Sequence, residues 1–146
     1  MLYHLALAII GLGGFVIASY IAGCKRKKKP LICPLRTSCD FVTTSDYSKF
    51  LGIHIEYIGM VYYGLVTLVH LAIFFFPAFA TLQILLLGLI ASSCAFLFSL
   101  YLTAIQAFVL KQWCTWCITS ACLCAIIFAL TYLSWSGASL LGIFLR

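Results

Sequence analysis

The most constraining feature of this sequence is an uncharged stretch that runs from Tyr57 to Leu110. It holds 54 residues without one Asp, Glu, Lys or Arg. As a single helix it would extend for roughly 81 Å, at about 1.5 Å per residue. Because the hydrocarbon core of a bilayer is only about 30 Å thick, the stretch must cross a membrane and fold back. We expect the turn at Phe76–Ala80, since Pro77 lacks an amide donor and disfavours a helix before it.

The composition is typical of a membrane protein and excludes most soluble classes. Hydrophobic residues make up 65% and charged residues 8% of the 146 residues, against about 45–50% and 25% in a soluble domain. These values exclude a water-soluble globule and a disordered chain. Five of the nine Lys and Arg residues form one run, Lys25–Lys29, rather than a basic face. We therefore expect no nucleic-acid partner.

Four apolar segments are long enough to cross a bilayer, which takes about 20 residues each. They are predicted at residues 2–23, 57–76, 81–110 and 114–134. Lipid requires each segment to pair its own backbone groups, as a helix does. The predicted fold is an all-α integral membrane protein of the cell membrane, a multi-pass bundle of four transmembrane helices in contact with membrane lipid. The whole chain, residues 1–146, is expected to form a single membrane domain.

The one long polar segment, residues 24–56, separates the first two predicted spans. It contains all three acidic residues and seven of the nine basic ones. Loops held by rigid elements often carry function, so this segment is the expected functional loop. Asp40 is a candidate N-cap for a short helix within it.

Two pairs of cysteines stand out among the eight in the chain. Cys33 and Cys39 lie in the polar loop, whereas Cys114 and Cys117 form a CxxC motif at the start of the fourth span. Two membrane crossings separate the pairs, and an even number of crossings returns the chain to the same face. We therefore expect all four thiols on one side of the membrane.

The spacing of these cysteines indicates thiol–disulfide chemistry. At a helix start, CxxC brings two sulfurs within disulfide reach, and the free amides and helix dipole favour the thiolate, which is the species that attacks a disulfide. Cys117 lies one turn deeper, about 4.5 Å along the axis, and so nearer to a lipid-soluble electron acceptor. Cys33 and Cys39 close a short loop, which suits a reversible redox pair. These four are the candidate catalytic residues.

The same four thiols leave an alternative open. A four-cysteine zinc site could use them, although the five residues between the loop cysteines exceed the usual zinc spacing of about two to four. The alternative hypothesis is therefore a structural membrane protein that binds partners, with or without a zinc ion held by these four cysteines. Cys94, Cys122 and Cys124 lie inside apolar spans and are expected to act as small hydrophobic residues. The role of Cys24 is left open.

Beyond the cysteines, the chain carries motifs that resemble a known family. A serine, Ser45, follows six residues after Cys39. Further motifs are Gly52-Ile53-His54, Gly59, Tyr63-Gly64, Gln106-Ala107-Phe108 and Trp113-Cys114-Thr115-Trp116-Cys117. Together they resemble the vitamin K epoxide reductase (VKOR) family, in its small prokaryotic form without a fused thioredoxin-like domain. The resemblance covers about Leu5 to Leu133.

The resemblance implies a membrane thiol oxidoreductase whose four-helix bundle surrounds a quinone of the menaquinone or ubiquinone type. A separate thioredoxin-like protein would give electrons to Cys33. Cys39 would then exchange with Cys114, and Cys117 would reduce the quinone. These steps would oxidise two thiols of the partner to a disulfide.

The resemblance also implies residues of the quinone site. Ser45 matches the family's Ser or Thr after the loop cysteines, Tyr47 matches an aromatic residue that caps the pocket, and Tyr62 is a candidate lining residue. Vertebrate members bind the quinone carbonyls with an Asn in the second helix and a Tyr four residues after CxxC. Here the second span has no Asn and Ala121 replaces the Tyr, so plain quinone reduction is expected rather than epoxide reduction.

Two histidines interrupt the apolar pattern of the second span and its entry. His54 stands where family members often have Pro, and it is either a proton carrier or, as we expect, an interfacial side chain. His70 falls in the middle of the span, where we expect a helix–helix hydrogen bond.

Charge and family resemblance disagree about the orientation of the chain. Cytoplasmic loops normally carry the excess of Lys and Arg. The face with the four thiols has eight such residues and the other face has only Arg146. The charge rule thus places the thiols in the cytoplasm, whereas the family habit places them outside, in an oxidising compartment. We give slightly more weight to the charge rule. The eight are Lys25, Arg26, Lys27, Lys28, Lys29, Arg36, Lys49 and Lys111.

Overall fold

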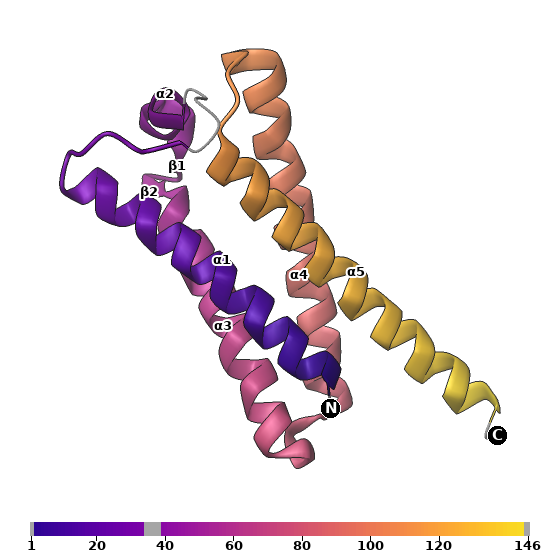
Figure 1. The fold of residues 1–146 in the computed structure, drawn as a ribbon. Coiled ribbons are helices and arrows are strands. Elements are labelled where there is room, and N and C mark those ends of the chain that lie inside the picture. Colours follow the sequence, from indigo (N-terminus) through magenta and orange to yellow (C-terminus); the bar gives the residue numbers. More distant parts are fainter. Residues whose placement is uncertain (1, 34–38, 145–146) are drawn as a thin grey trace.

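The computed structural model describes residues 2–33 and 39–144, with side chains described as far as Gly137. Within these residues, four helices are long and apolar enough to cross a membrane, which confirms the predicted fold class. They form a bundle. The short elements of the polar loop (α2, β1 and β2) lie at one end, and the start of α1 and the end of α5 lie toward the other end (Figure 1). The four are α1 (Leu2–Arg26), α3 (Ile55–Phe75), α4 (Leu82–Ala104) and α5 (Thr115–Phe144).

The helix ends differ from the predicted spans in two places. α1 continues past Gly23 to Arg26, because Lys25 and Arg26 interact favourably with the negative end of the helix dipole. α5 was expected to end near residue 134 but continues to Phe144. Ser, Trp and a single Gly carry only small helix penalties, so the weaker hydropathy after residue 134 does not stop the helix.

The turn between the second and third spans lies where Pro77 predicts it. α3 ends at Phe75, and a short 3₁₀ helix, η2 (Pro77–Phe79), reverses the chain. Thr81 then caps α4, since its hydroxyl oxygen accepts a bond from the Ile84 amide at 3.5 Å. Because of this reversal, α3 and α4, which are consecutive spans, run in opposite directions.

Close packing of α1 against α3 rests on two glycines of α1. Gly11 lies against Thr67, where an added Cβ would be 2.7 Å from the threonine Oγ1. At Gly14 an added Cβ would overlap the ring of Tyr63. Small residues allow this kind of approach between membrane helices. The third span also carries a run of small residues (Ala91, Ser92, Ser93 and Ala95), of which Ser92 is buried and donates to the Leu89 carbonyl of its own helix.

In the described residues of the polar loop, a short α-helix, a 3₁₀ helix and a hairpin follow one another. These are α2 (Cys39–Thr44), the 3₁₀ helix η1 (Asp46–Ser48) and a hairpin of β1 (Lys49–Phe50) with β2 (Ile53–His54). Leu51 and Gly52 both have positive φ, at 52° and 82°, as a two-residue hairpin turn requires. The expected short helix is present. Asp40 is not its N-cap, because α2 begins at Cys39 and Asp40 falls in the first turn, where its charge still suits the helix dipole.

A π-helical segment, η3 (Ile105–Leu110), ends the third span. Lys111 then adopts a left-handed conformation with φ of 50° and stops the helix. The chain turns back at the end of the bundle that carries the polar loop (Figure 1). This turn places the CxxC motif next to α2.

The glycine packing gives a test of the bundle. Gly14→Ala would drive a methyl group into the Tyr63 ring, and overpacking of this kind costs about 1–3 kcal/mol. We expect a lower midpoint of thermal unfolding in detergent. Gly13→Ala is the matched control, because an added Cβ there meets nothing within 4 Å. Equal midpoints for the two variants would contradict the packing of α1 on α3.

Candidate active site

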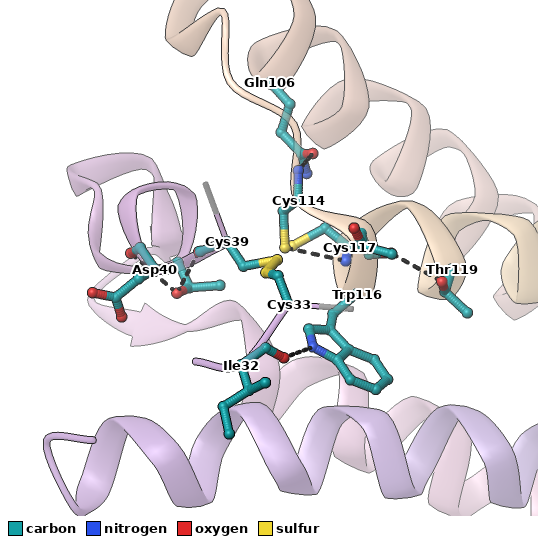
Figure 2. Close-up of a disulfide and its surroundings, with 11 residues drawn as sticks. Ile32, Cys33, Cys39, Asp40, Gln106, Cys114, Trp116, Cys117 and Thr119 are labelled. Atoms are coloured by element: carbon teal, nitrogen blue, oxygen red, sulfur yellow. Dashed lines mark hydrogen bonds between the residues drawn. A yellow bond between two sulfur atoms is a disulfide. The ribbon is translucent and has the colours of Figure 1, made fainter. Parts of the chain in front are cut away.

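The structure brings the four predicted cysteines together at the loop end of the bundle. Cys33 and Cys39 form a disulfide with their Cα atoms 6.2 Å apart, within the range found in proteins. Figure 2 shows this disulfide beside the sulfurs of Cys114 and Cys117. Cys39 and Cys114 are completely buried in one apolar cluster, and Cys33 and Cys117 pack against it. The cluster therefore joins the loop pair to the CxxC pair.

Cys114 occupies the position just before α5, where its sulfur meets free amides of the first turn. The Cys117 amide donates to Cys114 Sγ over 3.3 Å (Figure 2). The pKa of the Cys114 thiol lies below its ordinary value, chiefly through a hydrogen bond from the Cys117 side chain and also through the amides of Cys117 and Trp116. Burial opposes the shift. Cys114 is thus favoured as thiolate, the form that attacks a disulfide.

Gln106 holds the turn that leads into Cys114. Its backbone carbonyl accepts from the Gln112 amide at 3.2 Å, and its side-chain oxygen accepts from the Cys114 amide at 3.4 Å. Gln106 is buried, so replacing it with an apolar residue would leave the Cys114 amide without this partner. Sequence reasoning used Gln106 only as part of a motif. Its place in an otherwise apolar segment was the available signal of a structural role.

Trp116 of α5 forms a second contact with the polar loop. Its indole nitrogen donates to the Ile32 carbonyl at 3.0 Å, directly before Cys33 (Figure 2). Its ring also contacts Tyr20 of α1, with centroids 5.4 Å apart. In the structure the indole fixes the approach of the Cys33 segment to the CxxC turn.

A cavity of about 400 Å³ lies beside the cysteine cluster, a size typical of small-molecule sites. Residues of α1, α3, α4, α5 and the polar loop line it, and most of them are apolar. Cys117 is on its wall, whereas Cys114 and Cys39 are not among its lining residues. Cys117 is therefore the cysteine of the CxxC pair that a ligand in this cavity would meet.

The three residues expected at a quinone site all line this cavity. The Tyr62 hydroxyl is buried and has no hydrogen-bond partner among the described residues. The Ser45 hydroxyl donates to the Val42 carbonyl at 2.7 Å, which ties it to the end of α2. Tyr47 is half exposed at the loop side. Of the three, Tyr62 is the residue with a buried hydroxyl that has no partner within the described part of the chain and can bind a ligand.

Two charged residues on the cavity wall were not expected there. Lys25 at the end of α1 pairs with Glu56 at the start of α3, with Nζ and Oε1 3.0 Å apart. Both line the cavity. The available signal was that each stands at the edge of an otherwise uncharged span.

Other predicted residues fall outside the cavity. His54 does not line it and contacts the ring of Tyr57, with centroids 6.2 Å apart. The prediction of a helix–helix hydrogen bond at His70 was wrong. Its Nδ1 lies 3.1 Å from the Val66 carbonyl of its own helix, since a side chain can reach the carbonyl four residues earlier.

The remaining cysteines differ from one another in environment. Cys122 is exposed on the outside of the isolated chain, and Cys124 is buried with its sulfur 3.1 Å from the Tyr63 hydroxyl. Cys94 is also exposed yet contributes to the cavity wall. Cys24 packs against the redox cluster. Among residues 2–33 and 39–137, no three His, Cys, Asp or Glu side chains are grouped in a way that could hold a metal ion.

Comparison with known proteins gives one match to a family. The sequence model of the vitamin K epoxide reductase family matches residues 5–132, most of the chain. Among curated proteins no match is found.

The environment of Cys114 predicts how its thiol titrates. The thiolate absorbance of fully reduced protein is recorded against pH for the parent and for Cys114→Ser. The difference between the two curves reports Cys114, and its midpoint should lie below the ordinary pKa of a thiol. Cys117→Ala should raise this midpoint, because the Cys117 side chain is the largest cause of the lowered pKa. Cys122→Ala, on the same helix but exposed, should leave it unchanged. A midpoint unaffected by Cys117→Ala would contradict this account of the thiolate.

Proposed function

Because the chain belongs to the vitamin K epoxide reductase family, we propose that it oxidises the thiols of a separate thioredoxin-like protein and reduces a membrane quinone. The observation that carries this proposal is the burial of Cys39 and Cys114 in one cluster, with Cys117 on the wall of an apolar cavity. The arrangement offers a continuous path from the loop to a lipid-soluble acceptor.

The path consists of two disulfide exchanges and one quinone reduction. The partner's dithiol reduces the Cys33–Cys39 disulfide and becomes a disulfide itself. The loop dithiol then reduces a Cys114–Cys117 disulfide, Cys39 exchanging with Cys114. Finally the Cys114–Cys117 dithiol gives two electrons and two protons to the quinone, which becomes a quinol. A loop disulfide together with free Cys114 and Cys117 corresponds to the state before this last step.

The difference in exposure between the two loop cysteines supports different roles for them. Cys33 is partly exposed, whereas Cys39 is completely buried. Cys33 is therefore the loop cysteine that is more accessible to a protein partner. Attack on Cys33 releases Cys39, which lies in the same cluster as Cys114.

The cavity suits a quinone ring. A quinone head group is flat and largely apolar, with two carbonyl oxygens that accept hydrogen bonds. The cavity wall is mainly apolar and includes the unpartnered Tyr62 hydroxyl, a donor for one carbonyl. Ser45 and Tyr47 line the loop side, and Tyr47 would cover the ring. A menaquinone or ubiquinone type of acceptor fits this proposal.

We further propose that the thiol face looks into the cytoplasm. Eight of the nine Lys and Arg residues belong to that face, and positive residues are retained on the cytoplasmic side of a membrane. In this orientation the protein would make disulfides in cytosolic partners. The opposite orientation would require translocating the run Lys25–Lys29.

Quinone reduction by the purified protein tests the proposed function. With a reduced thioredoxin-like donor and a soluble quinone under anaerobic conditions, the parent should turn over. Cys117→Ala should reduce turnover to background, because Cys117 is the cysteine of the CxxC pair that lines the cavity wall. Cys122→Ala is the matched control and should retain the parental rate. A Cys117→Ala protein that reduces quinone at the parental rate would overturn the order of transfer.

Loss of the Tyr62 hydroxyl should weaken quinone binding. A neutral hydrogen bond contributes about 0.5–1.5 kcal/mol, so Tyr62→Phe should raise KM for the quinone by up to about tenfold. Tyr57→Phe, on the same helix but outside the cavity lining, is the control. Titration of quinone in steady-state assays gives KM for both variants. An unchanged KM in Tyr62→Phe would remove this residue from the quinone site.

A further inference from the structure

The ion pair between α1 and α3 is mostly shielded from solvent and lies near the cysteines. Lys25 Nζ lies 3.0 Å from one carboxylate oxygen of Glu56 and 3.2 Å from the other. The lysine side chain is 16% exposed and the glutamate side chain 5%. Both residues share the cavity wall with Cys117 and Tyr62. A charged pair thus stands at the place where a ligand would meet the reactive thiol.

Holding the two helices together does not by itself account for this pair. Removing two charges from water is costly, and well-packed apolar residues in place of a buried pair are often equally or more stabilising. α1 and α3 already pack closely through Gly11 and Gly14. The position of both residues on the cavity wall leaves room for a role toward a ligand.

The lysine retains a donor that can reach a ligand. An ammonium group has three N–H donors, and the two oxygens of Glu56 occupy at most two of them. The carboxylate also cancels the ammonium charge, so the cavity remains suited to a neutral molecule. A neutral ligand with a carbonyl oxygen, which becomes negative during the reaction, matches both properties.

Resting on the quinone reduction proposed above, we infer that Lys25 hydrogen-bonds one quinone carbonyl and protonates that oxygen as it gains electrons, with Glu56 holding the ammonium in place. The Cys114–Cys117 dithiol becomes a disulfide and loses two electrons and two protons. The quinone gains both and becomes a quinol. Lys25 gives one proton to the quinone oxygen and regains one from those that the thiols release, so the overall reaction balances without another reactant.

A neutral double variant tests the proton transfer. Lys25→Met with Glu56→Leu removes both charges and leaves neither one unpaired. We expect kcat for a neutral naphthoquinone to fall by about 100-fold, the scale of general acid catalysis. Reduction of the Cys33–Cys39 disulfide by a thiol donor, followed by thiol alkylation, should proceed at the parental rate. Lys27→Met is the matched control, since Lys27 is in the same basic run but exposed and away from the cavity wall.

A charge-preference assay tests the same site without turnover. Glu56→Gln leaves the Lys25 ammonium without its counterion. An anionic inhibitor, the conjugate base of 2-hydroxy-1,4-naphthoquinone, should then bind about tenfold more tightly than to the parent, the scale of a hydrogen bond to a charged group. The affinity for neutral 1,4-naphthoquinone should not increase. If the Lys25 ammonium does not reach the bound ligand, the preference should stay at the parental value.

The outcomes separate the two proposals. A parent protein that reduces no quinone overturns the proposed function. A parent that turns over, with parental kcat in the double variant, overturns the role of Lys25. If size-exclusion chromatography shows that the double variant does not fold, the affinities of Glu56→Gln for the anion and for the neutral quinone decide. Tighter binding of the anion supports the inference. Unchanged relative affinities overturn it.

Discussion

Contact between the polar loop and the start of α5 is the interaction on which the site depends. Electron transfer by disulfide exchange requires sulfurs in direct reach of one another, yet the loop and CxxC pairs are separated by two membrane crossings. Packing of Cys39 and Cys114 in one buried cluster brings the two pairs together. Trp116 bonds the Ile32 carbonyl, and Gln106 bonds the Cys114 amide. These two bonds position the pairs from opposite sides.

The membrane explains why few polar contacts can define the site. In a region without water, an unpaired polar group is costly, so most of the bundle is apolar and polar groups are confined to places with a partner. Two polar groups with unused hydrogen-bonding capacity lie on the cavity wall. The Tyr62 hydroxyl has no partner among the described residues, and Lys25 retains donor capacity beyond Glu56. An apolar site with a few such groups binds a flat, neutral carbonyl compound well.

Several features could be predicted from the sequence because they depend on local rules. Length and hydropathy predicted four spans, Pro77 predicted the turn between the second and third, and CxxC at a helix start predicted a thiolate-favouring position. Features that depend on distant contacts were missed or wrong. The Lys25–Glu56 pair joins residues 31 apart in the chain, and His70 bonds within its helix rather than across to another. Periodicity and composition carry no information about such choices.

The sequence by itself determined the fold class, because bilayer thickness sets the length of a span. It also determined that the two thiol pairs share one face, because an even number of crossings separates them. Only the tertiary structure decided which cysteines are buried and which meets the cavity. It also decided which polar groups face that cavity. The physical reason is that burial and pairing arise from close packing between helices. This packing depends on Gly11 and Gly14, on the π-helical turn before Lys111 and on the Trp116 bond, none of which hydropathy records.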